Sequence, residues 1–511
     1  MNKFVWYSPL LNLRGLHFLF LFVVLNPLQS QTLEENIEQV FTDFQLMGMS
    51  VWVENNGIEQ SFHFGLKDFT RNLEMDEDTK YRIASISKTV TALGLLKLYD
   101  DGAFDLDDPI NDYLSFPITN PSFPGTEITF RMLLSHTSSI QDGSGYNGFL
   151  NATFSQNPIP SLEELLLPQG SFYSANMYRT ESPGTYFTYS NLNYGVIATL
   201  IEAISNERFD VYMKNELLDP LGITGSYNIQ DINNINDIAV LYRNQGGWNP
   251  QFDNYQGVMP APPTNLPSLV LGTNGLFFSP QGGLRASANE LGTLLQFIKS
   301  EGASHPGIIS QQTLQEMKSI QWDFNGSNGD NYFDLFNRWG LGVHHANLSE
   351  DDQICLNSEW GSFIGHPGEA YGLISDAYFS EDGEVAFSFL TNGSFLGYQS
   401  GNTSSYYTVE EALFAVLCTY FNAPLSLNEV TLEQVFVFPN PVSEGLRIDG
   451  VQAFPIHAKL YDVRGVLLIT QRIEDNDSAA LNFSEIEKGL YFLTIDSPFD
   501  ESRKSFKVIK K

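Results

Sequence analysis

A serine followed three residues later by a lysine, Ser85-Ile86-Ser87-Lys88, opens a stretch with helical periodicity and constrains the fold more than any other feature. Apolar residues recur at helical spacing over residues 89–99, and Gly102 suits the end of the helix. Since residues three apart share a helix face, the Lys88 ammonium can lie beside the Ser85 hydroxyl, and the free N–H groups of a helix start favour a developing oxyanion. The pattern predicts an activated nucleophile. The plainer interpretation is a capping serine followed by a solvated lysine.

The first 31 residues have the pattern of a cleaved signal peptide. Lys3 and Arg14 precede an apolar run over residues 16–25, and polar residues follow it. The run is too short to cross a bilayer, which takes about 20 residues, so we expect no integral membrane segment after cleavage. The alternative, a buried N-terminal helix, fits the flanking residues less well.

Composition sets the size of the core and excludes some partners. The chain has 511 residues, 42% of them hydrophobic, which suffices for two or three domains with a large core. Its formal charge of -33 repels phosphates, so no nucleic acid partner is expected. Export would permit a disulfide between Cys355 and Cys418, but two buried free thiols are equally compatible with the sequence. No histidine or cysteine spacing suits a metal, so we expect no metal site and no cofactor.

The body of the chain, residues 32–425, alternates between strand and helix patterns. Residues 49–64 and 371–390 each read as a β-hairpin, and residues 409–420 read as a helix. A long insertion of helices and loops separates the two hairpins. These patterns predict an α+β fold, in which an antiparallel sheet is flanked by helices and a helical region, with the nucleophile at the seam.

A linker at residues 426–434 leads to a tail of short alternating strands, which predicts a small all-β, sandwich-like domain over residues 435–511. Its phrases Phe438-Pro439-Asn440-Pro441, Tyr461-Asp462-Val463-Arg464-Gly465 and Lys488-Gly489-Leu490-Tyr491 resemble the C-terminal type A sorting domain of type IX secretion in Bacteroidetes. The resemblance implies that the type IX machinery is a partner and that the protein crosses the periplasm and outer membrane to the cell surface or medium. The alternative is an accessory β-sandwich that binds carbohydrate.

Tyr189-Ser190-Asn191 is a second candidate element of the site. A nearby ammonium favours the phenolate of a tyrosine, so Tyr189 is a candidate to take the Ser85 proton and return it to the leaving group. Asn191 is a candidate donor to a substrate carbonyl. The alternative is a tyrosine used only for packing.

Gly365-His366-Pro367-Gly368-Glu369 is the third element. If these residues form an edge strand, alternate backbone groups face one side, so the Glu369 N–H becomes a second oxyanion donor, and Pro367 on the same side is tolerated. Gly368 leaves room for the substrate to approach the backbone. His366 is a candidate to orient the substrate, or to bind an anion when protonated, although a lone histidine is more often structural.

The order Ser-x-x-Lys, Tyr-x-Asn, His-x-Gly resembles the serine β-lactamase and penicillin-binding-protein family, in the branch of class C β-lactamases, D-alanyl-D-alanine carboxypeptidases, D-aminopeptidases and related esterases. The resemblance covers residues 35–420. It implies the β-lactamase/transpeptidase-like fold and an acyl-enzyme on Ser85, with Lys88 and Tyr189 moving protons. It also implies that Asn191 holds the substrate and that the N–H groups of Ser85 and Glu369 form the oxyanion hole.

The third element departs from the family pattern. Class C β-lactamases have Lys-Thr-Gly where this chain has His366-Pro367-Gly368, and a mostly neutral imidazole and a proline do not reproduce the contacts to a substrate carboxylate. Unless a nearby arginine substitutes, we expect a secreted esterase or amidase first, a D-amino-acid peptidase or D-alanyl-D-alanine carboxypeptidase second, and a β-lactamase third. The alternative of another class is a binding protein that kept the fold without the activity.

Overall fold

The structure is a computed structural model, and it describes residues 31–355, 360–423, 435–451, 455–473, 479–496 and 503–511. Two predictions fall outside these ranges: the signal peptide, of which only Gln31 is described, and the linker 426–434. The chain divides into two compact units. The first unit comprises Met1–Gln353 and Ser362–Val416, and the second comprises Ile354–Gly361 and Leu417–Lys511.

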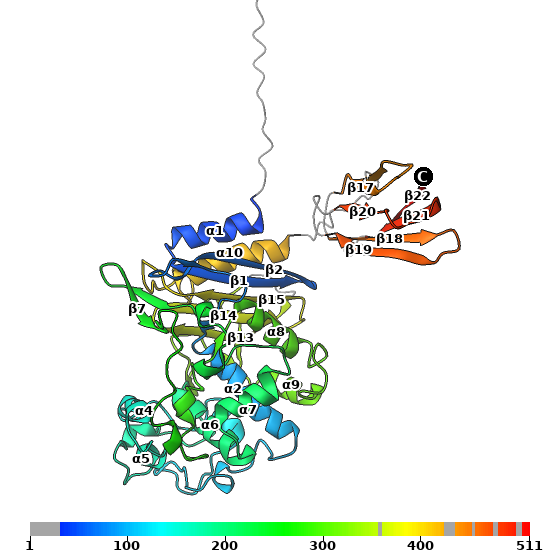
Figure 1. Ribbon diagram of the computed structural model, residues 1–511. Coiled ribbons are helices and arrows are strands. Elements are labelled where there is room, and N and C mark those ends of the chain that lie inside the picture. The colour runs from blue at the N-terminus through cyan, green and yellow to red at the C-terminus, as the bar shows by residue number, and fades with distance from the viewer. Residues whose placement is uncertain (1–30, 356–359, 424–434, 452–454, 474–478, 497–502) are drawn as a thin grey trace, which may run out of the picture. The chain divides into compact units, whose positions relative to one another are not determined.

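A sheet of nine strands among the described residues organises the first unit (Figure 1). Its neighbouring strands all run antiparallel. In spatial order the strands are β3 (Leu73–Glu74), β2 (Ile58–Asp68), β1 (Gly48–Asn55), β15 (Val385–Thr391), β14 (Leu373–Ser380), β13 (Phe363–Ala370), β12 (His344–Ala346), β11 (Arg338–Trp339) and β9 (Trp322–Asp323). The two predicted hairpins, β1–β2 and β14–β15, are confirmed. They meet along β1 and β15, so residues from both ends of this unit share one sheet.

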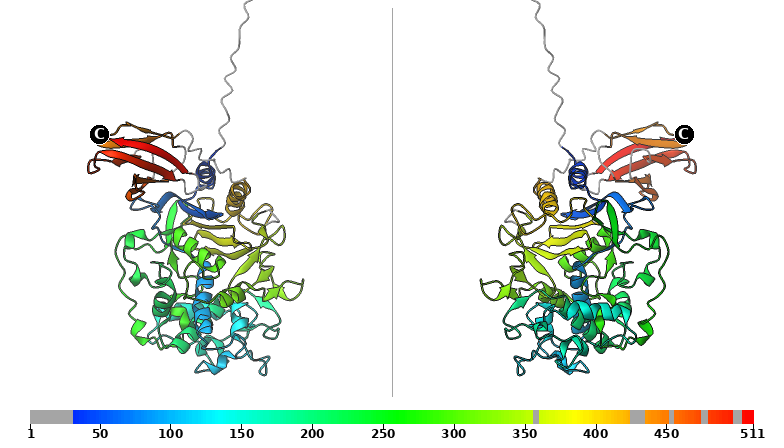
Figure 2. Two further views of the ribbon diagram at one scale, coloured as in Figure 1. Left: turned by 90° about the vertical axis from the view of Figure 1, so that its right-hand side faces the viewer. Right: turned by 90° about the vertical axis from the view of Figure 1, so that its left-hand side faces the viewer.

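Helices cover both faces of this sheet. Figures 1 and 2 show α1 and α10 over one face, and α2 and α8 with the other helices on the opposite side. The helices are α1 (Leu33–Asp43), α2 (Ile86–Asp100), α3 (Phe130–Leu134), α4 (Tyr146–Ser155), α5 (Glu163–Leu166), α6 (Asn191–Ser205), α7 (Phe209–Met213), α8 (Ala288–Lys299), α9 (Gln311–Lys318) and α10 (Thr408–Asn422). Strands covered on both faces are buried along their whole length, as β1, β14 and β15 are. The predicted α+β class is therefore confirmed.

Helix α2 lies between the sheet and the helical part and is buried nearly all round. Val90, Leu93 and Leu96 are each at most 1% exposed and belong to the largest hydrophobic cluster. Its neighbours include α6 and β13. A helix that is apolar on all sides is stable only inside such a core, so packing holds the start of α2 in place.

Helix α8 approaches the sheet closely because of one glycine. A Cβ added at Gly292 would lie 2.5 Å from the indole of Trp52 on β1, closer than real contacts allow. Beside it, Ser388 on β15 donates to Ala288 O at 2.8 Å. These contacts fix α8 against the middle of the sheet.

Among the described residues of the first unit, three short ribbons lie outside the main sheet. Their strands are β4 (Tyr81–Arg82) with β8 (Arg285–Ala286), β5 (Phe187–Thr188) with β10 (Gly329–Asp330), and β6 (Leu241–Asn244) with β7 (Trp248–Phe252). The first ribbon leads directly into the residues before α2. The second leads into Tyr189.

The C-terminal region is all-β, as predicted. Its strands are β16 (Phe436–Phe438), β17 (Gly445–Asp449), β18 (Ile456–Asp462), β19 (Leu467–Ile473), β20 (Ala480–Asn482), β21 (Gly489–Asp496) and β22 (Arg503–Lys510). They form one sheet in the order β16-β17-β20 and another in the order β19-β18-β21-β22. Both sheets contribute to a hydrophobic cluster of their own.

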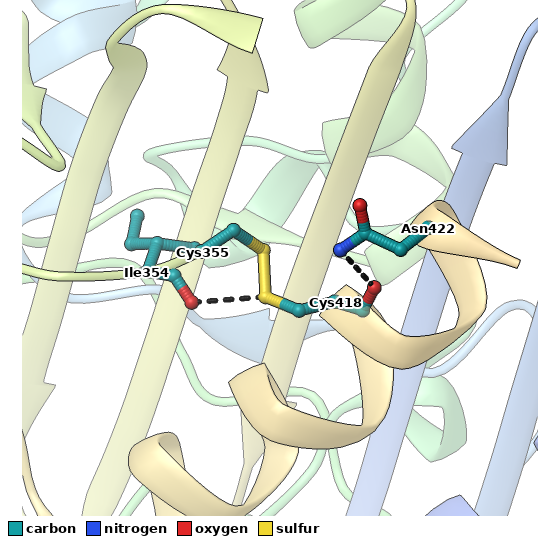
Figure 3. Close-up of a disulfide and its surroundings, with 4 residues drawn as sticks. All are labelled: Ile354, Cys355, Cys418 and Asn422. Carbon is teal, nitrogen blue, oxygen red and sulfur yellow. Dashed lines mark hydrogen bonds between the residues drawn. A yellow bond between two sulfur atoms is a disulfide. The ribbon is translucent and has the colours of Figure 1, made fainter. Parts of the chain in front are cut away.

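Cys355 and Cys418 form a disulfide, which settles the alternative that the sequence left open (Figure 3). Their Cα atoms are 5.6 Å apart although 63 positions separate them in the chain. Cys418 lies on α10, where its carbonyl accepts a hydrogen bond from Asn422 Nδ2 at 2.8 Å. Within the described part of the chain, no helix combines the length and apolarity needed to cross a membrane.

Candidate active site

Ser85 and Lys88 meet at the start of α2, as the Ser-x-x-Lys spacing predicts. Lys88 Nζ lies 3.0 Å from Ser85 Oγ and also donates to Gln281 O at 2.9 Å. The preceding Ala84 has a φ of 49°, a left-handed conformation that costs energy for a residue with a side chain. The chain thus turns sharply before α2, at the residue that precedes the hydroxyl.

Lys88 is 0% exposed, and its environment changes its acidity. Burial lowers its pKa to about 7, while the charge of Asp142 acts in the opposite direction. Near neutral pH a large share of the Lys88 side chain is therefore the free amine. A free amine has the lone pair needed to accept a proton from Ser85.

Tyr189 follows β5 and lies over the lysine, with Lys88 Nζ 4.8 Å from the centre of its ring. Rings of Phe336 and Trp339 pack around it, with centroids 5.2 and 5.8 Å away. Burial raises the pKa of the phenol well above its ordinary value, and the hydrogen bond with Ser85 offsets only part of the rise. The nearby Lys88 therefore does not make the phenolate the resting form, because desolvation by the aromatic cluster dominates. Tyr189 stands ready as a neutral O–H donor.

His366 on β13 is also buried, at 1% exposed. Burial, together with the charge of Lys88, lowers the pKa of its imidazole to about 3. Its Nδ1 lies 2.5 Å from Pro367 O, so this nitrogen carries the proton, and Nε2, 3.4 Å from the Tyr189 hydroxyl, acts as an acceptor. At neutral pH the ring therefore stays neutral and offers no positive charge to an anion.

Asn191 is the first residue of α6, and an aspartate that the sequence analysis missed holds it. Asn191 Nδ2 donates to Asp142 at 2.8 Å, and the backbone N–H groups of Asn191 and Leu192 donate to the same carboxylate at 3.0 and 2.9 Å. Ser190 Oγ adds a fourth contact at 3.0 Å. A carboxylate at a helix N-terminus is favoured by the free N–H groups and the helix dipole. Asp142 lies alone in a polar loop, so only its suitability as a cap could have indicated it.

The third element lies on β13, where that strand changes from interior to edge. Strand β12 pairs with residues 363–365, and no described strand continues this pairing along 366–370. Gly368 faces Ser85: a Cβ added there would lie 3.3 Å from Ser85 N and 2.4 Å from Ser375 Oγ. A side chain at this position would push β13 away from α2. The glycine therefore allows the close approach of strand and helix.

A cavity of about 680 Å³ opens between these elements. Of the predicted site residues, Ser85, Tyr189, Asn191, His366, Gly368 and Glu369 line it, while Lys88 lies beneath Ser85. Two loops that the sequence analysis did not include complete the wall, one around Phe333 and one over residues 400–407. No lysine or arginine is among the described residues that line the cavity. The substituting arginine considered above is therefore not found there.

The chain was compared with known proteins. Residues 33–403 match the family described as beta-lactamase, and residues 436–511 match the secretion system C-terminal sorting domain. Protein flp of Staphylococcus aureus (strain MRSA252) is 26% identical over 217 residues, which make up 42% of each protein. The putative penicillin-binding protein PbpX of Bacillus subtilis (strain 168) is 28% identical over 38% of this chain and 45% of its own length. The chain thus spans less than half of the length of these curated relatives.

Solved structures share the fold. D-amino acid amidase from Ochrobactrum anthropi SV3, complexed with L-phenylalanine, superposes with a TM-score of 0.55 at 19% identity, over 76% of this chain and 99% of that one. The octameric penicillin-binding protein homologue from Pyrococcus abyssi gives a TM-score of 0.54 at 19% identity, over 93% of this chain and 89% of that one. At such low identity the likeness establishes the fold alone.

Proposed function

The chain belongs to the beta-lactamase family, and from this premise we propose that it is an exported serine hydrolase that cleaves esters or amides through an acyl-enzyme on Ser85. One observation carries the proposal. Lys88 Nζ lies 3.0 Å from Ser85 Oγ, and burial lowers the pKa of Lys88 to about 7. A nucleophile and its base are thus within hydrogen-bond reach, and the base is partly unprotonated at neutral pH.

In the first half of the reaction, Ser85 Oγ attacks the carbonyl carbon of the substrate while its proton passes to Lys88. The former carbonyl oxygen becomes an oxyanion, which the N–H groups of Ser85 and Glu369 stabilise. Loss of one such donor typically costs about 10² to 10³ in rate. Collapse of the tetrahedral intermediate breaks the bond to the leaving group, which takes a proton from Tyr189, and Lys88 reprotonates Tyr189.

In the second half, water attacks the acyl-enzyme. Lys88, again a free amine, accepts the proton of the water and returns it to Ser85 Oγ as the acid leaves, so the enzyme regains its starting state. The neutral Nε2 of His366 accepts from the Tyr189 hydroxyl and orients it for these transfers. Asn191, fixed by Asp142, holds the substrate carbonyl group.

The cavity favours an esterase or amidase over a β-lactamase or D-alanyl-D-alanine carboxypeptidase. Both alternatives need to hold a substrate carboxylate, yet no described lining residue is a lysine or arginine, and His366 is neutral. A D-amino-acid peptidase or amidase remains the second candidate, supported by the fold shared with D-amino acid amidase. A binding protein without activity is disfavoured, because Ser85 and Lys88 still lie within hydrogen-bond distance.

The experiment that tests the proposal compares wild type with Ser85→Ala by intact-mass spectrometry after incubation with a fluorophosphonate, a fluorescent penicillin and a p-nitrophenyl ester. We expect a covalent adduct and ester turnover in wild type and neither in Ser85→Ala. Turnover that persists in Ser85→Ala would rule out this nucleophile. A folded wild type that gives no adduct and no turnover would favour the binding protein.

Export is the second part of the proposal. The tail, residues 435–511, acts as the signal that the type IX machinery reads, and the hydrolase domain, residues 32–425, is its cargo, bound for the cell surface or the medium. The match of residues 436–511 to a secretion sorting domain supports this. In a host with type IX secretion, a chain that ends at residue 425 is expected to accumulate in the periplasm, whereas the full chain leaves it. Equal export of both would contradict this role.

A further inference from the structure

An arginine without an acidic partner lies just before the nucleophile. Arg82 on β4 pairs directly with Arg285 on β8, so the two side chains lie on one face of this ribbon. Arg285 Nε and Nη2 donate to the Asp253 carboxylate at 2.9 and 2.7 Å, and Nη2 also donates to the Tyr255 hydroxyl at 3.3 Å. Among the described residues, the Arg82 guanidinium has neither a carboxylate partner nor a hydrogen-bond acceptor. Two guanidinium groups thus face one carboxylate.

The surroundings of Arg82 make this arrangement costly. Its side chain is partly buried, and burial and the charge of Arg285 both lower the pKa of its guanidinium, which still stays charged at neutral pH. Like charges directly opposite each other on a ribbon are destabilising. The chain has 60 acidic residues against 27 lysines and arginines, so carboxylates are not scarce. An anionic ligand would supply the charge that Arg82 lacks.

Aromatic rings hold the Arg82 guanidinium without occupying its donors. It lies over the ring of Phe252 on β7, 4.3 Å from the ring centre, and Phe252 stacks on Tyr371 with the ring centroids 4.8 Å apart. Attraction to the face of a ring does not use the N–H groups of the cation as hydrogen bonds. The fork of N–H donors in a guanidinium matches the oxygens of a carboxylate or a phosphate.

A second arginine lies at the same turn. Tyr371 and Gly372 connect β13 to β14, and a Cβ added at Gly372 would lie 3.2 Å from Arg243 Cγ. Arg243 on β6 is exposed and lies 5.5 Å from the ring centre of Tyr398, and it has no carboxylate partner among the described residues. Arg82 and Arg243 therefore bring positive charge to this turn from two different ribbons.

The turn directly follows the strand that forms one wall of the cavity. Gly368 on this strand lies against Ser85. Tyr371 comes three residues later, which corresponds to about 10 Å along an extended strand. Tyr398 accepts a hydrogen bond from the backbone of the turn at 2.7 Å and stacks on the cavity residue Tyr407, with the ring centroids 5.2 Å apart. An acyl chain that extends from Ser85 along this strand would therefore reach the turn.

From this arrangement we propose that Arg82 and Arg243 form a subsite for an anionic group, a carboxylate or a phosphate, at the far end of the acyl part of the substrate. The acyl chain runs along β13 from Ser85 to the turn, and its terminal anion pairs with Arg82. Neither arginine lines the cavity itself, so the subsite does not replace the cation that a β-lactam carboxylate requires close to the nucleophile. This inference rests on the proposed hydrolase function and specifies which esters or amides the site selects.

The test uses the mono-p-nitrophenyl esters of adipic, suberic and sebacic acid, with the methyl ester of each as the matched neutral substrate. With the full-length protein we expect kcat/KM for the best acid to exceed that for its methyl ester by at least about tenfold, with an optimum at one chain length. Arg82→Gln and Arg243→Gln should reduce this ratio, and Arg82→Lys, which keeps the charge but not the fork, should reduce it less. Arg338→Gln removes an arginine that pairs with Asp323 and does not line the cavity, so this matched control should leave the ratio unchanged.

A second readout does not require turnover. Octanoate is expected to slow fluorophosphonate labelling of Ser85 in wild type more than octanamide or octylamine does, and this difference should shrink in Arg82→Gln. That variant removes a like charge opposite Arg285, so its Tm should be no lower than that of wild type, which shows that it folds.

Inorganic phosphate separates an anion of the substrate from a free anion. If phosphate raises the Tm of wild type but not of Arg82→Gln, while acids and methyl esters are turned over equally, the site binds a free anion and the proposed substrate class is wrong. Ser85 labelling with no preference for acids and no stabilisation by phosphate would overturn the anion site and leave the hydrolase function standing. No labelling of Ser85 by any reagent would instead overturn the hydrolase function and the inference with it.

Discussion

The two walls of the cavity differ in the ionisable groups that they carry. The nucleophile wall, formed by Ser85, Lys88 and Tyr189, buries its one amine and lowers the pKa of that amine to about 7. The strand wall, formed by β13 with Tyr407 and Glu410, presents carboxyls and no lysine or arginine among its described residues. The first wall keeps the family pattern and the second departs from it. The comparison suggests that the bond-breaking chemistry is retained while substrate selection has changed.

The largest expected effect comes from removing the buried amine. In Lys88→Met the base is lost, so kcat/KM for a p-nitrophenyl ester should fall by about 10³ or more. The pKa of Lys88 is lower in the folded than in the unfolded state, so folding costs free energy below about pH 10: between about pH 7 and pH 10 the amine must shed its proton, and below about pH 7 a charged ammonium must be buried. An apolar side chain removes that cost. We therefore expect a Tm no lower than that of wild type by calorimetry.

The matched control is Lys97→Met on the same helix, which removes a lysine paired with Asp101 near the surface. It should retain wild-type turnover. If the two variants lost activity to the same extent, a general disturbance of α2 would explain both, and the role of Lys88 as a base would be contradicted.

The next effect tests Tyr189 as a proton donor. Tyr189→Phe keeps the ring contacts with Phe336 and Trp339 but removes the hydroxyl, so we expect kcat/KM to fall by about 10² with little change in Tm. Tyr194 on α6 offers the control, since its buried hydroxyl has no hydrogen-bond partner in the described residues. Tyr194→Phe should be nearly as active as wild type. Equal losses in both variants would argue against proton transfer through Tyr189.

The third prediction tests whether the strand wall determines which substrates the site accepts. The double variant His366→Lys with Pro367→Thr restores the Lys-Thr-Gly pattern of class C β-lactamases and adds a cation for a substrate carboxylate. We expect the rate of acylation by a fluorescent penicillin, divided by that by a fluorophosphonate, to rise about tenfold, because a charged partner strengthens such recognition. Pro367→Thr alone should change this ratio little. An unchanged ratio in the double variant would show that the motif does not set the selection.

The nucleophile wall was largely predictable from sequence because its parts are local. Three positions separate Ser85 from Lys88, and a helix turns that spacing into contact. The hairpins 49–64 and 371–390 were predictable for the same reason, from alternation around a turn. The degree of burial of Tyr189 and His366 could not be predicted from the sequence. Burial shifts the pKa values of both side chains, and it depends on aromatic rings from segments that are distant in the sequence.

The strand wall was less predictable because it is assembled from loops. The loop at residues 400–407 and the loop around Phe333 have no hydrophobic periodicity in the sequence that would predict their positions. A hydrogen bond from Ser405 Oγ to Phe333 O joins the two loops. The pairing of Cys355 with Cys418 was likewise open, since only the tertiary structure brings them together. The role of Asp142 was not predictable for the same reason. From a loop that is distant in the sequence, its carboxylate caps the start of α6 and raises the pKa of Lys88.

The prediction with the smallest expected effect tests the influence of Asp142 on Lys88. The Asp142 carboxylate holds the start of α6 and raises the pKa of Lys88, so Asp142→Asn should lower this pKa and make the free amine available at lower pH. The acidic limb of the kcat/KM profile, expected near pH 7 in wild type, should therefore move to lower pH, while stability falls by about 1 kcal/mol through the weakened cap. Asp78→Asn, an exposed change outside the cavity, should move neither. A limb that stays at the same pH in Asp142→Asn would mean that Lys88 is not the group titrating there, which would remove the main support for its role as the base.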